Sequence, residues 1–124
     1  PTPIVQTLYT VEGGQSAAAQ LLEMGCTAII CGSDIMALGA IRHCESIGKR
    51  VPEDVSVTGF DDSPLMAFTN PPMTTFRQPV KSMCEAAVTS LLAMIDGGMS
   101  SPRSLTFRSE LIVRKTTSRP PEKR

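Results

Sequence analysis

The chain has no excess of charge of either sign, because 12 lysines and arginines balance 12 aspartates and glutamates. Binding to nucleic acid or to an anionic membrane surface depends on a surplus of basic side chains. The composition therefore argues against a chain that binds DNA or a membrane by itself. With 124 residues, 41% of them hydrophobic, the chain has the size and composition of one compact domain.

Long apolar runs and an export signal are also missing from the sequence. No apolar run approaches the about 18 residues that a membrane span needs. The first residues show no basic region followed by an apolar stretch. We therefore expect a cytoplasmic protein without an export or membrane address.

Paired metal-ligand motifs are absent as well. The only histidine, His43, has no carboxylate or cysteine at metal-ligand spacing, so we expect neither a metal nor a cofactor. No Cys-x-x-Cys pair occurs, and three of the four cysteines lie inside apolar segments, where a thiol packs like a small hydrophobic side chain. We expect all of them to be reduced thiols. They are Cys26, Cys31, Cys44 and Cys84.

What the first half of the sequence does contain is a regular alternation of strand and helix patterns. Strands are predicted at 4–8, 27–31 and 55–58, with helices from a Thr10 cap through Met24 and from a Ser33 cap to about Ile47. The run at 27–31 is almost continuously apolar, which is typical of a strand covered by helices on both faces. The order predicts an α/β fold with a doubly wound, mostly parallel sheet.

The second half is less regular because prolines interrupt it. Prolines at 64, 71 and 72 allow only a short helical turn at 65–68 before an extended segment at 74–76. Pro79 suits the first turn of a helix that runs to Ile95 and has a wide apolar face. Short strands are predicted at 105–107 and 111–113. Prolines and mixed charge predict a disordered tail at 116–124.

The residues with the clearest chemistry follow the predicted strand at 55–58. The segment Gly-Phe-Asp-Asp-Ser-Pro at 59–64 brings two carboxylates, Asp61 and Asp62, to the end of that strand. In an open α/β sheet this edge is where ligands bind. A carboxylate there can accept two hydrogen bonds from adjacent sugar hydroxyls or from a base edge. A small-molecule sensor or binding protein is therefore the first hypothesis, with a purely turn-forming Asp61 as the plainer alternative.

Three longer strings carry a family resemblance. They are Cys-Gly-Ser-Asp-Ile-Met-Ala-Leu-Gly-Ala at 31–40, Val-Pro-Glu-Asp-Val-Ser-Val-Thr-Gly-Phe-Asp-Asp at 51–62 and Pro-Pro-Met-Thr-Thr-Phe-Arg-Gln-Pro at 71–79. Together with Glu-Leu-Ile-Val-Arg at 110–114, they resemble the LacI/GalR family of bacterial transcriptional repressors. The resemblance covers residues 4–116 and implies a partial periplasmic-binding-protein-like domain.

The resemblance also implies a division of the chain. Members of that family begin with a helix-turn-helix head and a hinge, followed by two subdomains that hold an effector between them. Residues 1–115 resemble the C-terminal portion of this effector-binding and dimerisation domain, and the segment at 75–100 would cross toward the N-terminal subdomain. Operator DNA would be bound only through an N-terminal head that is absent from this chain.

The implied function is effector sensing for a DNA-binding regulator. A small metabolite, such as a sugar or a nucleoside-like compound, would bind and change subdomain closure, provided that it favours one closure state over the other.

Candidate ligand-binding residues follow from the same resemblance. Asp61 matches the family's cleft aspartate, Ser33 a polar cleft position, and Tyr9 an aromatic side chain that stacks on the effector. Gln78 would line the cleft from the crossover segment. Ser33 equally suits a helix N-cap, and Tyr9 equally suits core packing.

Supporting and dimerising residues are implied too. Asp34 and Asp62 are expected to support the site without touching the ligand. Family members dimerise through surfaces that here correspond to Ala37, Leu38, Ala40, Ile41, Leu65 and Phe68. Small residues on the helix at 34–47 would let two helices approach closely, although they could instead pack on the sheet. A homodimer is expected. The apolar face at 79–95 would be covered by a second copy or by rearrangement, because large apolar patches rarely stay exposed.

Two other functions remain open. A periplasmic sugar-binding protein of an uptake system shares the fold, and fold does not decide function. An enzyme could use adjacent carboxylates for acid–base chemistry. No nucleophile with a paired base, phosphate loop or metal cluster accompanies them, so we expect no catalytic residue and no enzymatic activity.

Overall fold

The computed structural model describes residues 1–98 and 104–122. The chain forms two compact units, Pro1–Arg77 with Leu111–Arg124 and Gln78–Glu110, and each is described by itself. Residues 99 and 100 of the predicted crossover segment, and 123 and 124 of the predicted tail, lie outside the described residues.

The helices of the first unit begin and end where the sequence predicts. In α1 (Val11–Glu23) the Thr10 hydroxyl accepts a hydrogen bond from the Gly13 amide at 2.9 Å. In α2 (Asp34–Ser46) the Ser33 hydroxyl accepts one from the Met36 amide at 3.2 Å. Each bond satisfies an amide that has no partner inside the helix. Glycines with φ of +83° and +73°, Gly25 and Gly48, follow the two helices.

Glycines in the middle of both helices allow α1 and α2 to pack at close range. A Cβ atom on Gly39 would lie 2.0 Å from the Val11 carbonyl oxygen, and one on Gly14 would lie 2.1 Å from the Met36 carbonyl oxygen. A glycine inside a helix costs about 1 kcal/mol relative to alanine. Here that cost is offset by a helix contact that no larger residue permits.

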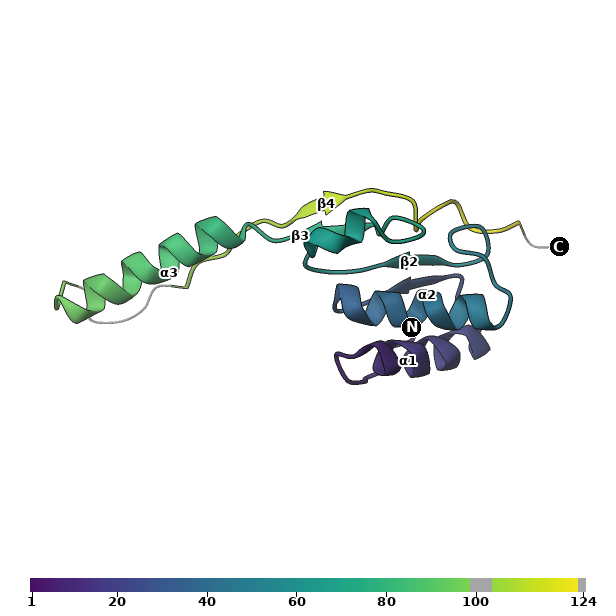
Figure 1. Ribbon diagram of the computed structural model, residues 1–124. Helices are drawn as coiled ribbons and strands as arrows, with labels where there is room; N and C mark the ends of the chain where they lie inside the picture. The colour runs from purple at the N-terminus through teal and green to yellow at the C-terminus, as the bar shows by residue number, and fades with distance from the viewer. Residues whose placement is uncertain (99–103, 123–124) are drawn as a thin grey trace. The chain divides into compact units, whose positions relative to one another are not determined.

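The strands of the first unit are short. β1 (Ala28–Ile30) pairs in parallel with β2 (Ser56–Thr58), with Ile29 opposite Val57. Both helices lie on one side of this pair (Figure 1). The prediction that helices cover both faces is wrong, because helices lie on one side only and Ile30 is 83% exposed.

Two predicted strands do not form. No residue of 4–8 belongs to a strand, and Ile4 and Leu8 are exposed. Residues 105–107 are not a strand either. Strand periodicity alone does not supply the hydrogen-bonded neighbour that a strand requires. The β1 strand pairs only with β2 in the described part of the chain.

A second strand pair follows the short 3₁₀ helix η1 (Pro64–Ala67). It consists of β3 (Thr75–Arg77) and β4 (Glu110–Ile112). Isolated parallel bridges join Thr58 to Thr74 and Asp61 to Arg77, so the segment leaving β2 runs beside β3. The architecture is a partial α/β domain with parallel strands, which confirms the predicted fold class.

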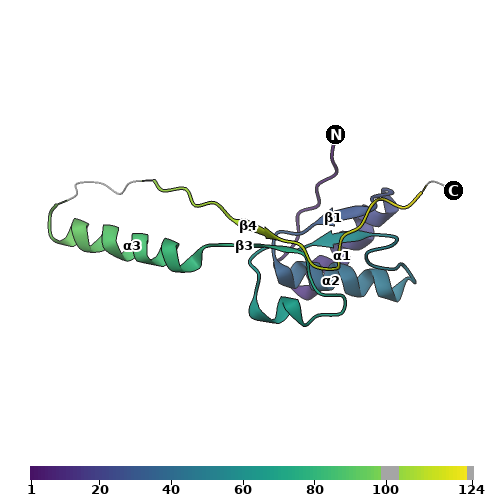
Figure 2. The same cartoon turned by 90° about the horizontal axis from the view of Figure 1, so that it is seen from above.

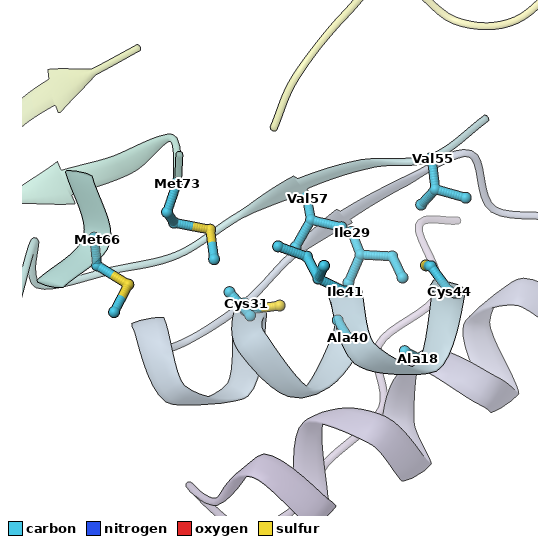
Figure 3. Packing of buried hydrophobic residues seen from close by; sticks show 11 residues of the cluster. Ala18, Ile29, Cys31, Ala40, Ile41, Cys44, Val55, Val57, Met66 and Met73 are labelled. Atoms are coloured by element: carbon cyan, nitrogen blue, oxygen red, sulfur yellow. The ribbon is translucent and has the colours of Figure 1, made fainter. Parts of the chain in front are cut away.

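The core of the first unit lies between α2 and the two parallel strands. Figure 3 shows Ile29 and Val57 from the strands beside Ile41 and Cys44 from α2. Burial raises the pKa of the Cys31 thiol to about 12, so this thiol stays protonated at neutral pH. The cluster consists of Ala18, Ile29, Cys31, Ala37, Ala40, Ile41, Cys44, Val55, Val57, Met66 and Met73.

The C-terminal tail is ordered further than predicted. Thr116 is fully buried, and its hydroxyl donates to the Val57 carbonyl at 2.6 Å and accepts from the Thr74 amide at 2.9 Å. The Val57 amide donates to the Thr116 carbonyl at 2.9 Å. The chain thus runs alongside β2, as Figure 2 shows. The prediction of disorder from 116 onward is wrong for this part, because the tail satisfies backbone groups at the open edge of β2.

The second unit contains α3 (Val80–Ile95), preceded by Pro79. No side chain of this helix is buried, and Val88, Leu91 and Leu92 are each more than half exposed. Leu105 and Phe107 line a hollow along it together with α3 residues. The idea that a second copy or a rearrangement covers this apolar face stays a prediction. No helix among the described residues has the length and apolar character to cross a membrane.

Candidate functional site

The carboxyl ends of β1 and β2 bring two predicted site residues to one edge. Ile30 lies opposite Thr58 in the parallel register, and Ser33 and Asp61 each follow three residues later. The Cys31 amide donates to the Thr58 carbonyl at 2.9 Å, and the Asp34 amide donates to the Phe60 carbonyl at 3.0 Å. These bonds continue the pairing beyond the strands, so both residues lie where open α/β sheets bind ligands.

The buried carboxylate of Asp34 links the segments that form this edge through hydrogen bonds. Asp34 is 3% exposed, and its carboxylate accepts hydrogen bonds at 2.7 Å from the Ser63 amide and from the Thr75 hydroxyl. A Cβ atom on Gly59 would lie 2.4 Å from one of its oxygens, so only glycine fits there. The carboxylate also lies in the first turn of α2, where negative charge is favoured. Asp34 thus links α2 to the loop at Ser63 and to β3, and its role as a support for a ligand site stays a prediction.

Asp62 is held by two arginines. Its carboxylate oxygens lie 2.7 Å from Arg77 Nε and 2.8 Å from Arg114 Nη1, and its side chain is 5% exposed. Burial by itself would raise the pKa of Asp62, but the hydrogen bonds and charges of Arg114 and Arg77 outweigh it and hold the pKa below its usual value. Arg114 also donates to the Met73 carbonyl at 2.9 Å.

Sequence reasoning missed both arginines as part of the site. Arg77 and Arg114 stand in the strings at 71–79 and 110–114, and they are the charged residues that could have paired with the predicted Asp62. Which of several basic residues meets a given carboxylate depends on strand pairing, which the sequence alone did not reveal.

Asp61 is exposed and has an unusual backbone conformation. Its φ is +113°, and the φ of Asp62 is +58°, in the region that glycine favours. The Asp61 amide donates to the Phe76 carbonyl at 2.9 Å. Both features are compatible with a turn residue and with a ligand-binding carboxylate.

The Tyr9 side chain lies beside the segment that follows β1. A Cβ atom on Gly32 would lie 3.1 Å from the Tyr9 hydroxyl oxygen, so the phenol lies directly beside the residue that precedes Ser33. Tyr9 is 70% exposed, which makes the core-packing alternative wrong. It lines a hollow of about 450 Å³ together with Gln6, Cys31, Gly32 and Met36.

Gln78 is the first residue of the second unit, so the structure does not place it relative to these residues. Its role in ligand binding remains a prediction. Among the described residues, no group of three or more histidine, cysteine or acidic side chains could hold a metal ion.

The predicted dimer surface divides into two groups. Three of its residues are at most 5% exposed because they pack inside the chain's own core, so their prediction as interface residues is wrong. They are Ala37, Ala40 and Ile41. By contrast, Leu65 and Phe68 are 69% and 84% exposed, and Leu38 is half-buried. These three remain predicted interface residues.

Comparison with known proteins identifies relatives of this chain. Residues 3–117 match the periplasmic binding protein-like domain. The chain is 54% identical over 122 residues to the HTH-type transcriptional regulator MalR of Streptomyces coelicolor, covering 98% of the chain and 35% of that protein.

Solved structures are similar over most of the chain. The complex of the transcriptional regulator CelR with cellobiose is 35% identical with a TM-score of 0.82, covering 87% of this chain and 34% of that one. A LacI family transcriptional regulator from Arthrobacter in complex with lactose is 30% identical with a TM-score of 0.77, covering 90% and 44%. The chain thus spans about a third of the length of its curated relative MalR. It belongs to the periplasmic-binding-protein-like family, in the form found in LacI-family transcriptional regulators.

Proposed function

We propose that this chain is the effector-sensing part of a LacI-type transcriptional regulator and that its effector binds at the carboxyl edge of β1 and β2. The observation that supports the proposal is that Ser33 and Asp61 each follow a paired strand by three residues, while the Tyr9 hydroxyl lies beside Gly32. One hydroxyl, one carboxylate and one exposed aromatic ring can together bind a polar molecule that has an apolar face.

A sugar fits this chemistry best. The Asp61 carboxylate can accept hydrogen bonds from two neighbouring hydroxyls, while the Tyr9 ring can pack against the C–H face of a pyranose. Two similar regulators were solved with the disaccharides cellobiose and lactose. We therefore propose a disaccharide as the effector class. A nucleoside-like compound is the second candidate, because an aromatic ring also stacks on a base.

Signal transmission would use the two points where the chain leaves and re-enters the first unit. These points are Arg77 and Leu111. An effector that binds one closure state more tightly shifts the protein toward that state, and the energy of that preference would change the geometry of a DNA-binding head. DNA binding itself is assigned to a head outside these 124 residues.

Dimerisation is proposed through three apolar residues of the predicted surface, the exposed Leu65 and Phe68 and the half-buried Leu38. Symmetric pairing of two chains would match the two-fold symmetry of operator sites. A transport role is less well supported than regulation, since the similar proteins described above are transcriptional regulators.

Calorimetric titration of the protein, as its gene encodes it, tests the proposal. The panel is cellobiose, maltose, lactose and ribose, which separates β-linked from α-linked disaccharides and both from a single sugar ring. We expect saturable binding of at least one disaccharide and at least tenfold weaker binding in Asp61→Asn. Binding that is equal in Asp61→Asn and the unmodified protein would contradict the site, and failure of the whole panel would contradict the effector class.

Asp54→Asn is the matched control for that titration. It removes a carboxylate of the same unit whose partner is Arg50, at 3.0 Å. Because Asp54 is not among the residues at the carboxyl edge, the affinity for sugar is expected to stay unchanged.

A further inference from the structure

Two consecutive residues at the proposed site have positive φ although neither is a glycine. Asp61 has a φ of +113° and Asp62 a φ of +58°. Side chains with a Cβ atom rarely adopt this region, and such residues persist only where the surroundings hold them. The groups that hold these two backbones therefore decide the position of the Asp61 carboxylate.

The holding groups come from the β3 region and from the chain that follows β4. The Asp61 amide donates to the Phe76 carbonyl at 2.9 Å, and the next residue of that strand, Arg77, pairs with Asp62. Arg114 pairs with the other Asp62 oxygen. Asp61 is thus fixed on one side by a backbone bond and on the other by the anchored side chain of its neighbour.

The two ion pairs are not equivalent. The side chain of Arg114 is 16% exposed, and it also donates to the Met73 carbonyl at 2.9 Å, so its position is set by the core. The side chain of Arg77 is 51% exposed, and solvent screens its charge more strongly. Arg114 therefore provides the rigid anchor, and Arg77 ties the anchored carboxylate to β3.

We propose that Asp62 is a positioning residue for effector binding: its ion pairs with Arg77 and Arg114 hold the backbone conformation in which Asp61 binds the effector. This inference rests on the proposed function of Asp61. It extends that function, because the affinity for the effector would then also depend on Asp62, a residue that does not contact the ligand. It also connects the effector site to the two segments through which the chain leaves and re-enters the first unit.

A double-mutant cycle with cellobiose separates positioning from a merely structural role. Asp62→Asn keeps the shape of the side chain but removes its charge. We expect it to weaken cellobiose binding about tenfold in the unmodified protein and to have no further effect in Asp61→Asn. Equal weakening in both backgrounds would overturn the proposal, because a general structural defect does not depend on Asp61.

Hydrogen exchange provides a readout that does not depend on any ligand. In Asp62→Asn the Asp61 amide, bonded to the Phe76 carbonyl, is expected to exchange at least tenfold faster, while the Val57 amide in the core keeps its rate. An unchanged rate at Asp61 would overturn the positioning role. If Asp61→Asn alone leaves cellobiose affinity intact, the proposed function fails, and the exchange rate still decides whether Asp62 holds this backbone.

Two further variants keep the test decisive. Arg77→Gln removes the more exposed partner of Asp62. It is expected to weaken cellobiose binding and to speed exchange at Asp61, both to a smaller extent than Asp62→Asn. This variant tests the proposal even if Asp62→Asn does not fold. Asp54→Asn removes the Arg50–Asp54 pair of the same unit and is expected to change neither cellobiose binding nor exchange at Asp61. Faster exchange at Asp61 in Asp54→Asn would overturn the assignment to Asp62.

Discussion

Thr75 donates a hydrogen bond at 2.7 Å to the buried carboxylate of Asp34, a residue 41 positions earlier in the chain. This bond joins the first turn of α2 to β3, so the helix and the second strand pair share one buried anion. The same carboxylate accepts the Ser63 amide. The loop that carries Asp61 and Asp62 is therefore linked, through the Ser63 amide, to the same carboxylate that joins α2 to β3.

Replacing Thr75 with valine tests this connection. The change keeps the side-chain shape but leaves one buried carboxylate oxygen without its donor, which costs about 1–3 kcal/mol. We expect the free energy of unfolding, measured by urea titration, to fall by that amount. Thr2→Val, at an exposed position, is the control and should have no measurable effect. Equal stability of the Thr75 variant and the control would contradict the connection.

Gly39→Ala tests the close contact of α1 and α2. Helix propensity alone would favour alanine by about 1 kcal/mol. Because the added Cβ would lie 2.0 Å from the Val11 carbonyl oxygen, we expect net destabilisation instead, of about 1–3 kcal/mol from overpacking. Thermal unfolding measures the change. Ser16→Ala, on the exposed face of α1, should be neutral or slightly stabilising, and a stabilised Gly39→Ala would refute the contact.

Truncation tests the ordered part of the tail. A chain ending after Arg119 keeps the bonds of Thr116 to Val57 and Thr74, whereas a chain ending after Lys115 loses them. We expect the first to be as stable as the parent chain and the second to be less stable by at least about 2 kcal/mol, since it leaves buried backbone groups unpaired. Two equally stable truncations, as judged by urea titration, would argue against the packed tail.

Stability should depend on pH through Asp62. Its pKa is lower in the folded chain than in the unfolded one, so its contribution is fully present above the ordinary aspartate pKa of about 3.9. The contribution is lost as the pH falls from there through the folded pKa. We therefore expect the decrease of unfolding free energy between about pH 5 and pH 2 to be shallower in Asp62→Asn. Identical slopes would contradict the ion cluster.

Salt distinguishes this cluster from an exposed pair of the same type. The Arg50 side chain lowers the pKa of Asp54 to about 2, but this pair is open to solvent. Added salt should therefore reduce the effect of Asp54→Asn on stability more than that of Asp62→Asn. Measurements at low and high ionic strength give the comparison, and an equal salt response in both variants would contradict the burial of Asp62.

Phe68→Asp tests the proposed dimer surface. Phe68 is 84% exposed in the single chain, so the change should leave the unfolding temperature of a monomer unchanged while weakening self-association. Sedimentation equilibrium measures the association. Met24→Asp, at the end of α1 and 61% exposed, should leave it intact. A Phe68→Asp protein that still associates like the parent would refute this surface.

Much of the local structure followed from the sequence. Thr10 and Ser33 were predicted as caps, and both accept the amide three residues later, because a cap needs only a short polar side chain within one turn. The order of strand and helix patterns predicted the α/β class, and the segment 59–64 predicted a polar sheet edge. These features depend on neighbours in the chain, so periodicity and residue type suffice to predict them.

Other features were decided only by the tertiary structure. Ala37 and Ala40 look alike as packing or interface residues, and only the position of α2 on the sheet shows that they face inward. Likewise, nothing in the sequence alone shows that Arg77 and Arg114 share one carboxylate, or that Thr116 satisfies β2. Contacts between residues far apart in the chain depend on strand pairing and register, and these result from the packing of the whole unit.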